Sequence, residues 1–180
     1  MDRESELNLL VKAFSFATRK HHGHTREDAE KTPYIFHPIG LVEVLVNVGK
    51  ITDINTICAA LLHDTVEDTE TTPGELTEAF GTEICDIVME VTDDKSLSKE
   101  ARKQAQIDHA KHLSKKARAV KLADKISNLR DVTANPPPDW PLERRQQYFD
   151  WSKNVIDGLR GDWIELEVEF DRQFEKRPIR

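Results

Sequence analysis

Apolar residues recur at helical spacing along most of the chain, and the two-residue alternation typical of strands is almost absent. Two amphipathic stripes show this spacing clearly: Leu7, Leu10, Phe14 and Ala17 near the start, and Ile84, Ile87, Val88 and Val91 after Gly81. A helix with one apolar stripe buries that stripe against other helices. The pattern therefore predicts an all-α fold.

Local signals mark the ends of several helices. Residues 72–75, TPGE, have the Thr-x-x-Glu form of a capping box with proline in the first turn, and Ser98 precedes another helical stretch. The segment 135–141, NPPPDWP, cannot be helical and should precede a last long helix that begins near Leu142. Since that segment is short and the sequence has no internal repeat, we expect residues 1–180 to form a single domain.

Composition and charge restrict the class of protein. With 38% hydrophobic and 33% charged residues, and no apolar window long enough to span a membrane, a globular protein is expected. The charged N-terminus, MDRESELNLL, is unlike a secretory signal, so we expect a cytoplasmic protein. Cys58 and Cys85 lie in apolar runs and should be buried, reduced thiols. The net charge of −7 argues against a nucleic-acid polymer as partner but allows a small phosphorylated ligand.

The segment 59–71, AALLHDTVEDTET, places four ionisable residues inside an apolar run. On a continuous helix His63, Asp64, Glu67 and Asp68 would share one polar face, and the core side would carry Ala59, Leu62 and Val66. Buried charges without partners are costly, so a site that binds a proton or a metal is the favoured interpretation.

Two further segments carry matching chemistry. His37 directly precedes Pro38, which predicts an N-cap-like position at a helix start, with the imidazole free to face a cleft. Asp124, Asn128 and Asp131 form one polar stripe of a helix whose opposite side carries Leu122, Ile126 and Leu129. Together, His37, His63, Asp64 and Asp124 offer two nitrogens and two oxygens, a donor set suited to Mn²⁺, Fe²⁺ or Zn²⁺.

Each of these residues also has an ordinary explanation. His37 alone could cap a helix, the His63-Asp64 pair could lie on a solvated face, and Asp124 could form a surface salt bridge. The metal interpretation depends on their occurrence in this order within otherwise apolar helices.

The order H…HD…D resembles the signature of the HD hydrolase superfamily. The segments TPYIFHPIGL, AALLHDTVEDTETT, VTDDKSLSKEARKQ and VKLADKISNLRD also resemble the hydrolase domain of the RelA/SpoT alarmone enzymes, over about residues 5–175. The length is similar to that of their stand-alone animal relatives. The resemblance implies a hydrolase that removes the 3′-pyrophosphate of ppGpp, without synthetase or regulatory domains.

The resemblance also implies roles for individual residues. One Mn²⁺ ion would be bound by the four residues His37, His63, Asp64 and Asp124. Glu67 and Asp68 would position and deprotonate the attacking water, and Asn128 would contact the nucleotide. A further group would surround the base, ribose and phosphates of a small nucleotide substrate: Arg19, Lys20, Arg26, Lys99, Arg102, Arg144 and Tyr148.

Several alternatives stay open at this level. Lys99 and Arg102 could belong to a solvated helix face, Arg144 and Tyr148 could form a surface stack, and periodicity alone places Tyr148 in the core. Glu27 stands where these enzymes commonly have lysine, which puts one phosphate or base contact in doubt.

The two histidines of DHAKH, His109 and His112, raise the possibility of a second metal, but their neighbours are polar and favour a solvated surface. A phosphorylated adenine nucleotide such as NADPH is an alternative substrate. A nucleotide-binding module without turnover is a further alternative, although it would not need Glu67 and Asp68. The sequence leaves the oligomeric state open.

Overall fold

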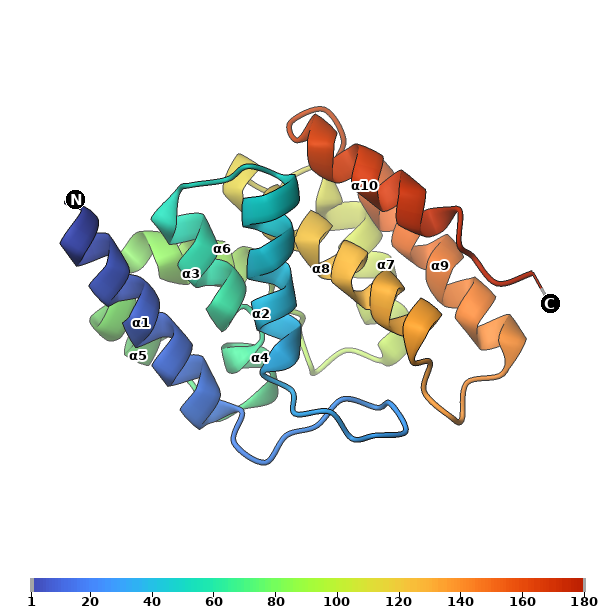
Figure 1. The fold of residues 1–180 in the computed structure, drawn as a ribbon, viewed down its shortest axis with the longest axis horizontal. Coiled ribbons are helices and arrows are strands. Elements are labelled where there is room, and N and C mark those ends of the chain that lie inside the picture. The colour runs from blue at the N-terminus through green and yellow to red at the C-terminus, as the bar shows by residue number, and fades with distance from the viewer. Residues whose placement is uncertain (1, 180) are drawn as a thin grey trace.

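A computed structural model describes residues 2–179, and every regular element within them is a helix. The prediction of an all-α fold is therefore confirmed. Figure 1 shows α2 and α8 in the middle of the molecule, with α1 on one side and α9 and α10 on the other. The elements in order are α1 (Arg3–Lys20), α2 (Phe36–Glu43), the π-helical η1 (Val44–Val48), α3 (Ile54–Leu62), α4 (Thr65–Asp68), α5 (Pro73–Phe80), α6 (Thr82–Val91), α7 (Lys99–Ala110), α8 (Lys115–Ala134), α9 (Leu142–Asp157) and α10 (Ile164–Phe174).

The predicted helix ends agree with the structure where the local signal is strong. The side chain of Thr72 accepts the amide of Glu75 at the start of α5, and Ser98 accepts the amide of Ala101 at the start of α7. Gly81 ends α5 with a φ of 86°, a conformation that favours glycine. The proline-rich segment 135–141 lies between α8 and α9.

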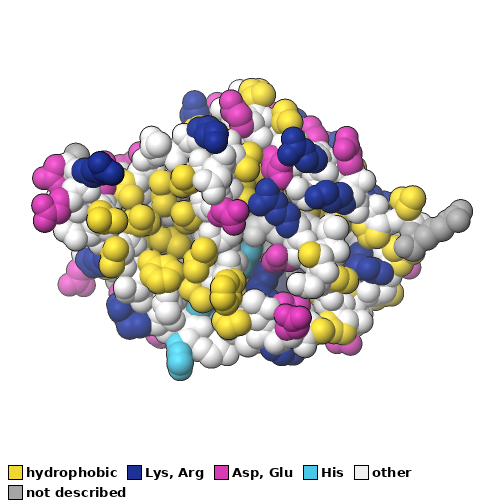
Figure 2. Space-filling view, in the orientation of Figure 1, with side chains coloured by type: hydrophobic (Ala, Val, Ile, Leu, Met, Phe, Trp, Pro, Cys, Tyr) yellow, Lys and Arg dark blue, Asp and Glu magenta, His cyan; other side chains and the backbone are white. Residues whose placement is uncertain are grey.

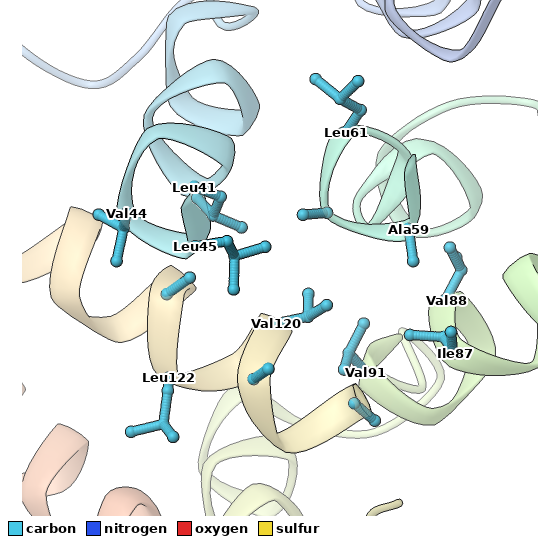
Figure 3. Close-up of a cluster of buried hydrophobic side chains, with 14 of the residues drawn as sticks. Leu41, Val44, Leu45, Ala59, Leu61, Ile87, Val88, Val91, Val120 and Leu122 are labelled. Atoms are coloured by element: carbon cyan, nitrogen blue, oxygen red, sulfur yellow. The ribbon is translucent and has the colours of Figure 1, made fainter. Parts of the chain in front are cut away.

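One hydrophobic core joins α1 through α10, and α8 contributes much of it. Figure 3 shows side chains of α2, η1, α3, α6 and α8 that meet in this core, among them Leu41, Leu45, Ala59 and Val120. The predicted stripe of α6 is confirmed, because Ile84, Ile87, Val88 and Val91 are all buried. None of the helices within residues 2–179 is long and apolar enough to cross a membrane.

The predicted stripe of α1 is partly wrong. Leu7 and Phe14 are 60% and 42% exposed, whereas Phe16 and Ala17 are buried with Ala13. Apolar residues cover more than one face of this helix, so helical spacing does not select a single stripe. Packing selects it instead, since α1 lies on α3 and the ring of Phe16 meets that of Phe80 edge to face at 5.3 Å.

Both cysteines are buried and free, as predicted. Cys58 lies on α3 and Cys85 on α6, two helices that pack against each other. Burial raises the pKa of the Cys58 thiol to about 12.

Asp53 caps α3, the helix that leads to His63. Its carboxylate accepts the amide of Thr56 at 2.9 Å and pairs with Lys116 at 3.0 Å. Asp53→Ala should therefore lower the free energy of unfolding by about 1 kcal/mol, with a smaller loss for Asp53→Asn, which keeps a cap. Urea unfolding measures both, and Asp86→Ala on the exposed face of α6 is the control for loss of a carboxylate.

The effect of Asp53 should also depend on pH. Burial opposes ionisation, but the bonds from Thr56 and Lys116 outweigh it and hold the pKa of Asp53 below its ordinary value. The folded state thus favours the carboxylate, so its contribution is present above the ordinary pKa and is lost as pH falls through the folded-state pKa. Equal unfolding curves for wild type and Asp53→Ala at neutral pH would contradict this prediction.

Candidate active site

The chain turns at His63 and Asp64, where a continuous helix was predicted. α3 ends at Leu62 and the short α4 begins at Thr65, so the expected helix is interrupted, although His63, Asp64, Glu67 and Asp68 still line one cavity. Side chains close the last turn of α3: Thr65 Oγ1 donates to the carbonyl of Leu62, and His63 Nδ1 donates to that of Ala60. Such local bonds compete with continuation of the helix.

His37 was predicted at an N-cap-like position, but it lies within the first turn of α2, whose N-cap is Ile35. Its imidazole is buried and points toward the end of α3 and the middle of α8. Nε2 of His37 lies 3.3 Å from Oδ1 of Asp124 and 4.0 Å from Oδ2 of Asp64. Three segments far apart in sequence therefore meet at one point.

The four predicted metal ligands meet at this point. Ligand atoms of His37, His63 and Asp124 lie within 4.8 Å of one another, and Nε2 of His63 lies 2.8 Å from Oδ2 of Asp64. Because Nδ1 of His63 donates to the Ala60 carbonyl, Nε2 is the ring nitrogen that faces the cluster, where Asp64 raises the pKa of the imidazole against the effect of burial. This buried Nε2 lies close to the Asp64 carboxylate but forms no hydrogen bond of good geometry within residues 2–179, which fits a ligand of a divalent metal ion.

The charge state of the cluster also suits a cation. Burial by itself would raise the pKa values of Asp64 and Asp124, but adjacent cationic groups outweigh it. His63 holds the pKa of Asp64 well below its ordinary value, and Lys125, with its Nζ 3.0 Å from Asp124 Oδ2, does the same for Asp124. Burial lowers the pKa of His37, so its imidazole favours the neutral form that binds metals.

Glu67 and Asp68, here called the acidic pair, line the same small cavity of about 190 Å³ as the four ligands. Oε2 of Glu67 accepts the amide of Asp93 at 3.0 Å, and Oδ1 of Asp68 lies 2.7 Å from Nζ of Lys95. Burial raises the pKa of Glu67; the Asp93 amide opposes this shift and the carboxylate of Asp64 adds to it. The pair thus offers a carboxylate of increased basicity beside the ligand cluster.

Arg26 and Asn128 link this small cavity to a larger one of about 550 Å³. The guanidinium of Arg26 donates to Asn128 Oδ1 at 2.7 Å and to Asp131 Oδ2 at 2.8 Å. Asn128 in turn donates to Oδ1 of Asp124 at 2.6 Å. Of the predicted nucleotide contacts, Asn128 is therefore bonded directly to the predicted metal ligand Asp124, and Arg26 is connected to it through Asn128.

A third cavity of about 370 Å³ adjoins the acidic pair and carries most of the predicted phosphate contacts. Its lining includes Lys99, Arg102, Arg144 and Tyr148. The guanidinium of Arg144 lies over the ring of Trp140 at 4.3 Å, so its stacking partner is not Tyr148. Figure 2 shows histidine and charged side chains in a hollow near the middle of one face of the molecule.

The structure does not bring Arg19 and Lys20 into the lining of the described cavities. Arg19 is exposed near the end of α1, and Lys20 pairs with Glu70 and Glu75 at 3.0 Å each. His109 and His112 are exposed, in agreement with the solvated setting expected for them. Glu27 is exposed and lines both larger cavities.

Sequence reasoning missed three residues of this region. The hydroxyl of Tyr34 donates to Asp64, and burial raises the pKa of this hydroxyl. Lys95 contacts the acidic pair, and Lys125 pairs with Asp124 while lying 4.4 Å from the ring centre of Trp151. A signal was available for all three: Lys125 follows Asp124, Tyr34 precedes His37 by three residues, and Lys95 follows Asp94.

Comparisons with known proteins agree with this geometry. The family model described as "HD domain" matches residues 13–148. The guanosine-3′,5′-bis(diphosphate) 3′-pyrophosphohydrolase MESH1 of Danio rerio is 46% identical over 98% of both chains. The human protein of the same name is 47% identical over 97% of this chain and 98% of its own.

A solved structure gives the same result for the fold. It is that of a metazoan ortholog of SpoT, described as hydrolysing ppGpp and playing a role in starvation responses. It superposes with a TM-score of 0.91 at 44% identity, and the match covers 94% of this chain and 95% of that one. The chain therefore belongs to the HD domain family, within the group that contains the MESH1 pyrophosphohydrolases.

Proposed function

We propose that this protein is a metal-dependent hydrolase that removes the 3′-pyrophosphate of guanosine alarmones and converts ppGpp and water into GDP and pyrophosphate. The observation that carries this proposal is the position of the acidic pair in one cavity with His37, His63, Asp64 and Asp124. Five relatives named as guanosine-3′,5′-bis(diphosphate) 3′-pyrophosphohydrolases, 44% to 49% identical to this chain, support it.

His37, His63, Asp64 and Asp124 would hold the metal, which we propose to be a single Mn²⁺ ion. Two imidazoles and two carboxylates are a donor set that Mn²⁺ accepts, with positions left for other ligands. When bound, a divalent cation supplies a Lewis acid that lowers the pKa of water and polarises a phosphoryl oxygen. Ala60 and Tyr34 orient His63 and Asp64 through the hydrogen bonds described above.

In this proposal the acidic pair orients the attacking water and accepts its proton. Glu67 is the general base, because its carboxylate is partly buried, has a raised pKa and is held by the Asp93 amide. Asp68 orients the water together with Glu67 or assists the departing ribose oxygen. The net reaction adds one water across the bond between the ribose 3′-oxygen and the pyrophosphate.

The three adjoining cavities suit a nucleotide with phosphates at two positions. We propose that the base and ribose lie near Arg26, Asn128 and Tyr148, and that phosphates lie toward Lys99, Arg102 and Arg144. Arg26 and Asn128 line both the small and the largest cavity, and the acidic pair lines both the small cavity and the third one. We also propose that residues 5–175 act as one hydrolase domain, since their buried side chains form one core.

The direct test supplies purified protein and Mn²⁺ with ppGpp, pppGpp or NADPH and measures released pyrophosphate and orthophosphate. Pyrophosphate should appear from ppGpp and pppGpp. Orthophosphate from NADPH with intact ppGpp would contradict the proposed substrate. Nucleotide binding without any product would indicate a binding module.

The basic residues of the third cavity give a further prediction. Arg144→Ala should raise KM for ppGpp by about tenfold, equivalent to about 1.4 kcal/mol, with a smaller change in kcat, if the guanidinium binds the ground state and the transition state equally. Arg19→Ala is the matched control, because it removes an exposed arginine outside the described cavities. Equal KM values for the two variants would argue that Arg144 belongs only to a solvated face.

A further inference from the structure

Lys95 lies in the loop of residues 92–98, between α6 and α7, and contacts both members of the acidic pair. Its Nζ is 2.7 Å from Oδ1 of Asp68 and 3.4 Å from Oε1 of Glu67. Two residues earlier, the amide of Asp93 donates to the other oxygen of Glu67 at 3.0 Å. One loop therefore contacts three of the four carboxylate oxygens by way of an ammonium group and a backbone amide.

The electrostatic surroundings of the acidic pair explain why a cation is needed there. The side chains of Glu67 and Asp68 are only 17% and 31% exposed, so water screens their mutual repulsion incompletely. Asp64 and Asp93 add negative charge beside Glu67. Among the ion pairs within residues 2–179, Lys95 is the cation that pairs with Glu67 and Asp68.

Lys95 also lines the third cavity, together with Lys99 and Arg102, where phosphate binding is an alternative role. A lysine in that place could contact a substrate phosphate. Lys99 lines the same cavity and forms no ion pair in the described part of the chain, so its ammonium is available to an anion. The ammonium of Lys95 is already engaged by two carboxylates at short distance, which favours a role through them.

We propose that Lys95 is a positioning residue that pairs with the carboxylates of Glu67 and Asp68 and holds them oriented for proton transfer. This inference rests on the proposed function, because it assigns the acidic pair to proton transfer. The ammonium, whose side chain is 49% exposed, offsets the negative charge of the pair.

The contact is tested first without catalysis, by a double-mutant cycle on the metal-free protein. Lys95→Met should shift the unfolding equilibrium toward the unfolded state by about two- to fivefold, the range expected for an exposed ion pair. The same substitution in an Asp68→Asn background should have a smaller effect. Equal effects in both backgrounds would mean that Lys95 and Asp68 do not interact, which overturns the inference.

Kinetics then separate positioning from phosphate binding. Lys95→Met should lower kcat by about tenfold or more with little change in KM, and it should move the acid limb of the kcat profile to higher pH. Lys95→Arg should restore most of the activity. Lys99→Met, the matched comparison in the same cavity, should raise KM and leave the acid limb in place.

The outcomes distinguish this inference from the proposed function. If wild type releases pyrophosphate but Lys95→Met only raises KM, as Lys99→Met does, Lys95 is a phosphate contact and the positioning role is wrong. Wild type that binds Mn²⁺ but releases no pyrophosphate would overturn the proposed function, and the positioning role with it.

Discussion

His63→Ala should abolish both the release of pyrophosphate from ppGpp and the stoichiometric binding of Mn²⁺, while the helical content stays largely unchanged. His63 supplies the Nε2 that faces Asp64 at 2.8 Å and lies within reach of His37 and Asp124. Asp64→Ala should behave in the same way. Metal analysis of the purified variants and far-ultraviolet circular dichroism measure the two properties independently.

Thermal unfolding adds a quantitative check to the metal prediction. A metal that binds only the folded state stabilises it by about 2.7 kcal/mol when its concentration is one hundred times Kd. Addition of Mn²⁺ should therefore raise the Tm of wild type and of His109→Ala, whose imidazole is exposed on α7, but not of His63→Ala. Stoichiometric Mn²⁺ in both His63→Ala and Asp64→Ala would exclude the ligand assignment.

Glu67→Gln should keep the bound metal and the affinity for substrate but lower kcat by about 10²-fold or more, the range typical of a lost general base. The amide keeps the shape of the side chain and can still accept the Asp93 amide, yet it cannot take a proton. Asp68→Asn should have a similar or milder effect. The double variant should lose far less than the product of the two single effects, because both residues act on one water.

The stability of Glu67→Gln shows whether its loss of activity arises from unfolding. Burial, with Asp64 nearby, raises the pKa of Glu67 in the folded state. The folded chain therefore binds a proton at Glu67 more tightly than the unfolded chain does. In metal-free wild type, stability should therefore decrease as pH rises from the ordinary pKa of glutamate through the raised one. Glu67→Gln removes this decrease and should be at least as stable as wild type at neutral pH.

The decisive comparison is kcat together with Mn²⁺ content for Glu67→Gln and Asp68→Asn. If both variants hold metal and turn over at near-normal rates, the acidic pair cannot be the proton acceptor. Glu67 and Asp68 would then have to act as support for His63 and Asp64.

Much of the fold was predictable because its signals are local. Ser98 begins α7, Gly81 ends α5 and the prolines of 135–141 separate α8 from α9, each through the backbone chemistry of a few adjacent residues. The convergence of His37, His63, Asp64 and Asp124 was predicted from their order within apolar segments together with the resemblance to the HD hydrolases. Helical periodicity alone placed Asp124 and Asn128 on one face of α8.

The remaining errors arise where side-chain hydrogen bonds or packing against distant segments decide the outcome. The turn at His63 depends on hydrogen bonds to the end of α3, which helical spacing does not reveal. The buried face of α1 depends on packing against α3. Lys95 and Tyr34 reach the site from loops, whereas Lys20 pairs with Glu70 and with Glu75 of α5 instead of lining a described cavity. Residue type alone did not distinguish the side chains that line the site from those that pair elsewhere.

The two buried cysteines provide an internal reporter of core opening. Thiol reagents react with the thiolate, and Cys58 is fully buried with a pKa raised to about 12, so the folded molecule is almost inert at this position. Modification of Cys58 then proceeds through molecules in which the packing around α3 has opened, and its rate reports the free energy of that opening. The native chain can thus be followed by covalent labelling, in either the metal-free or the metal-loaded state, without the introduction of any probe.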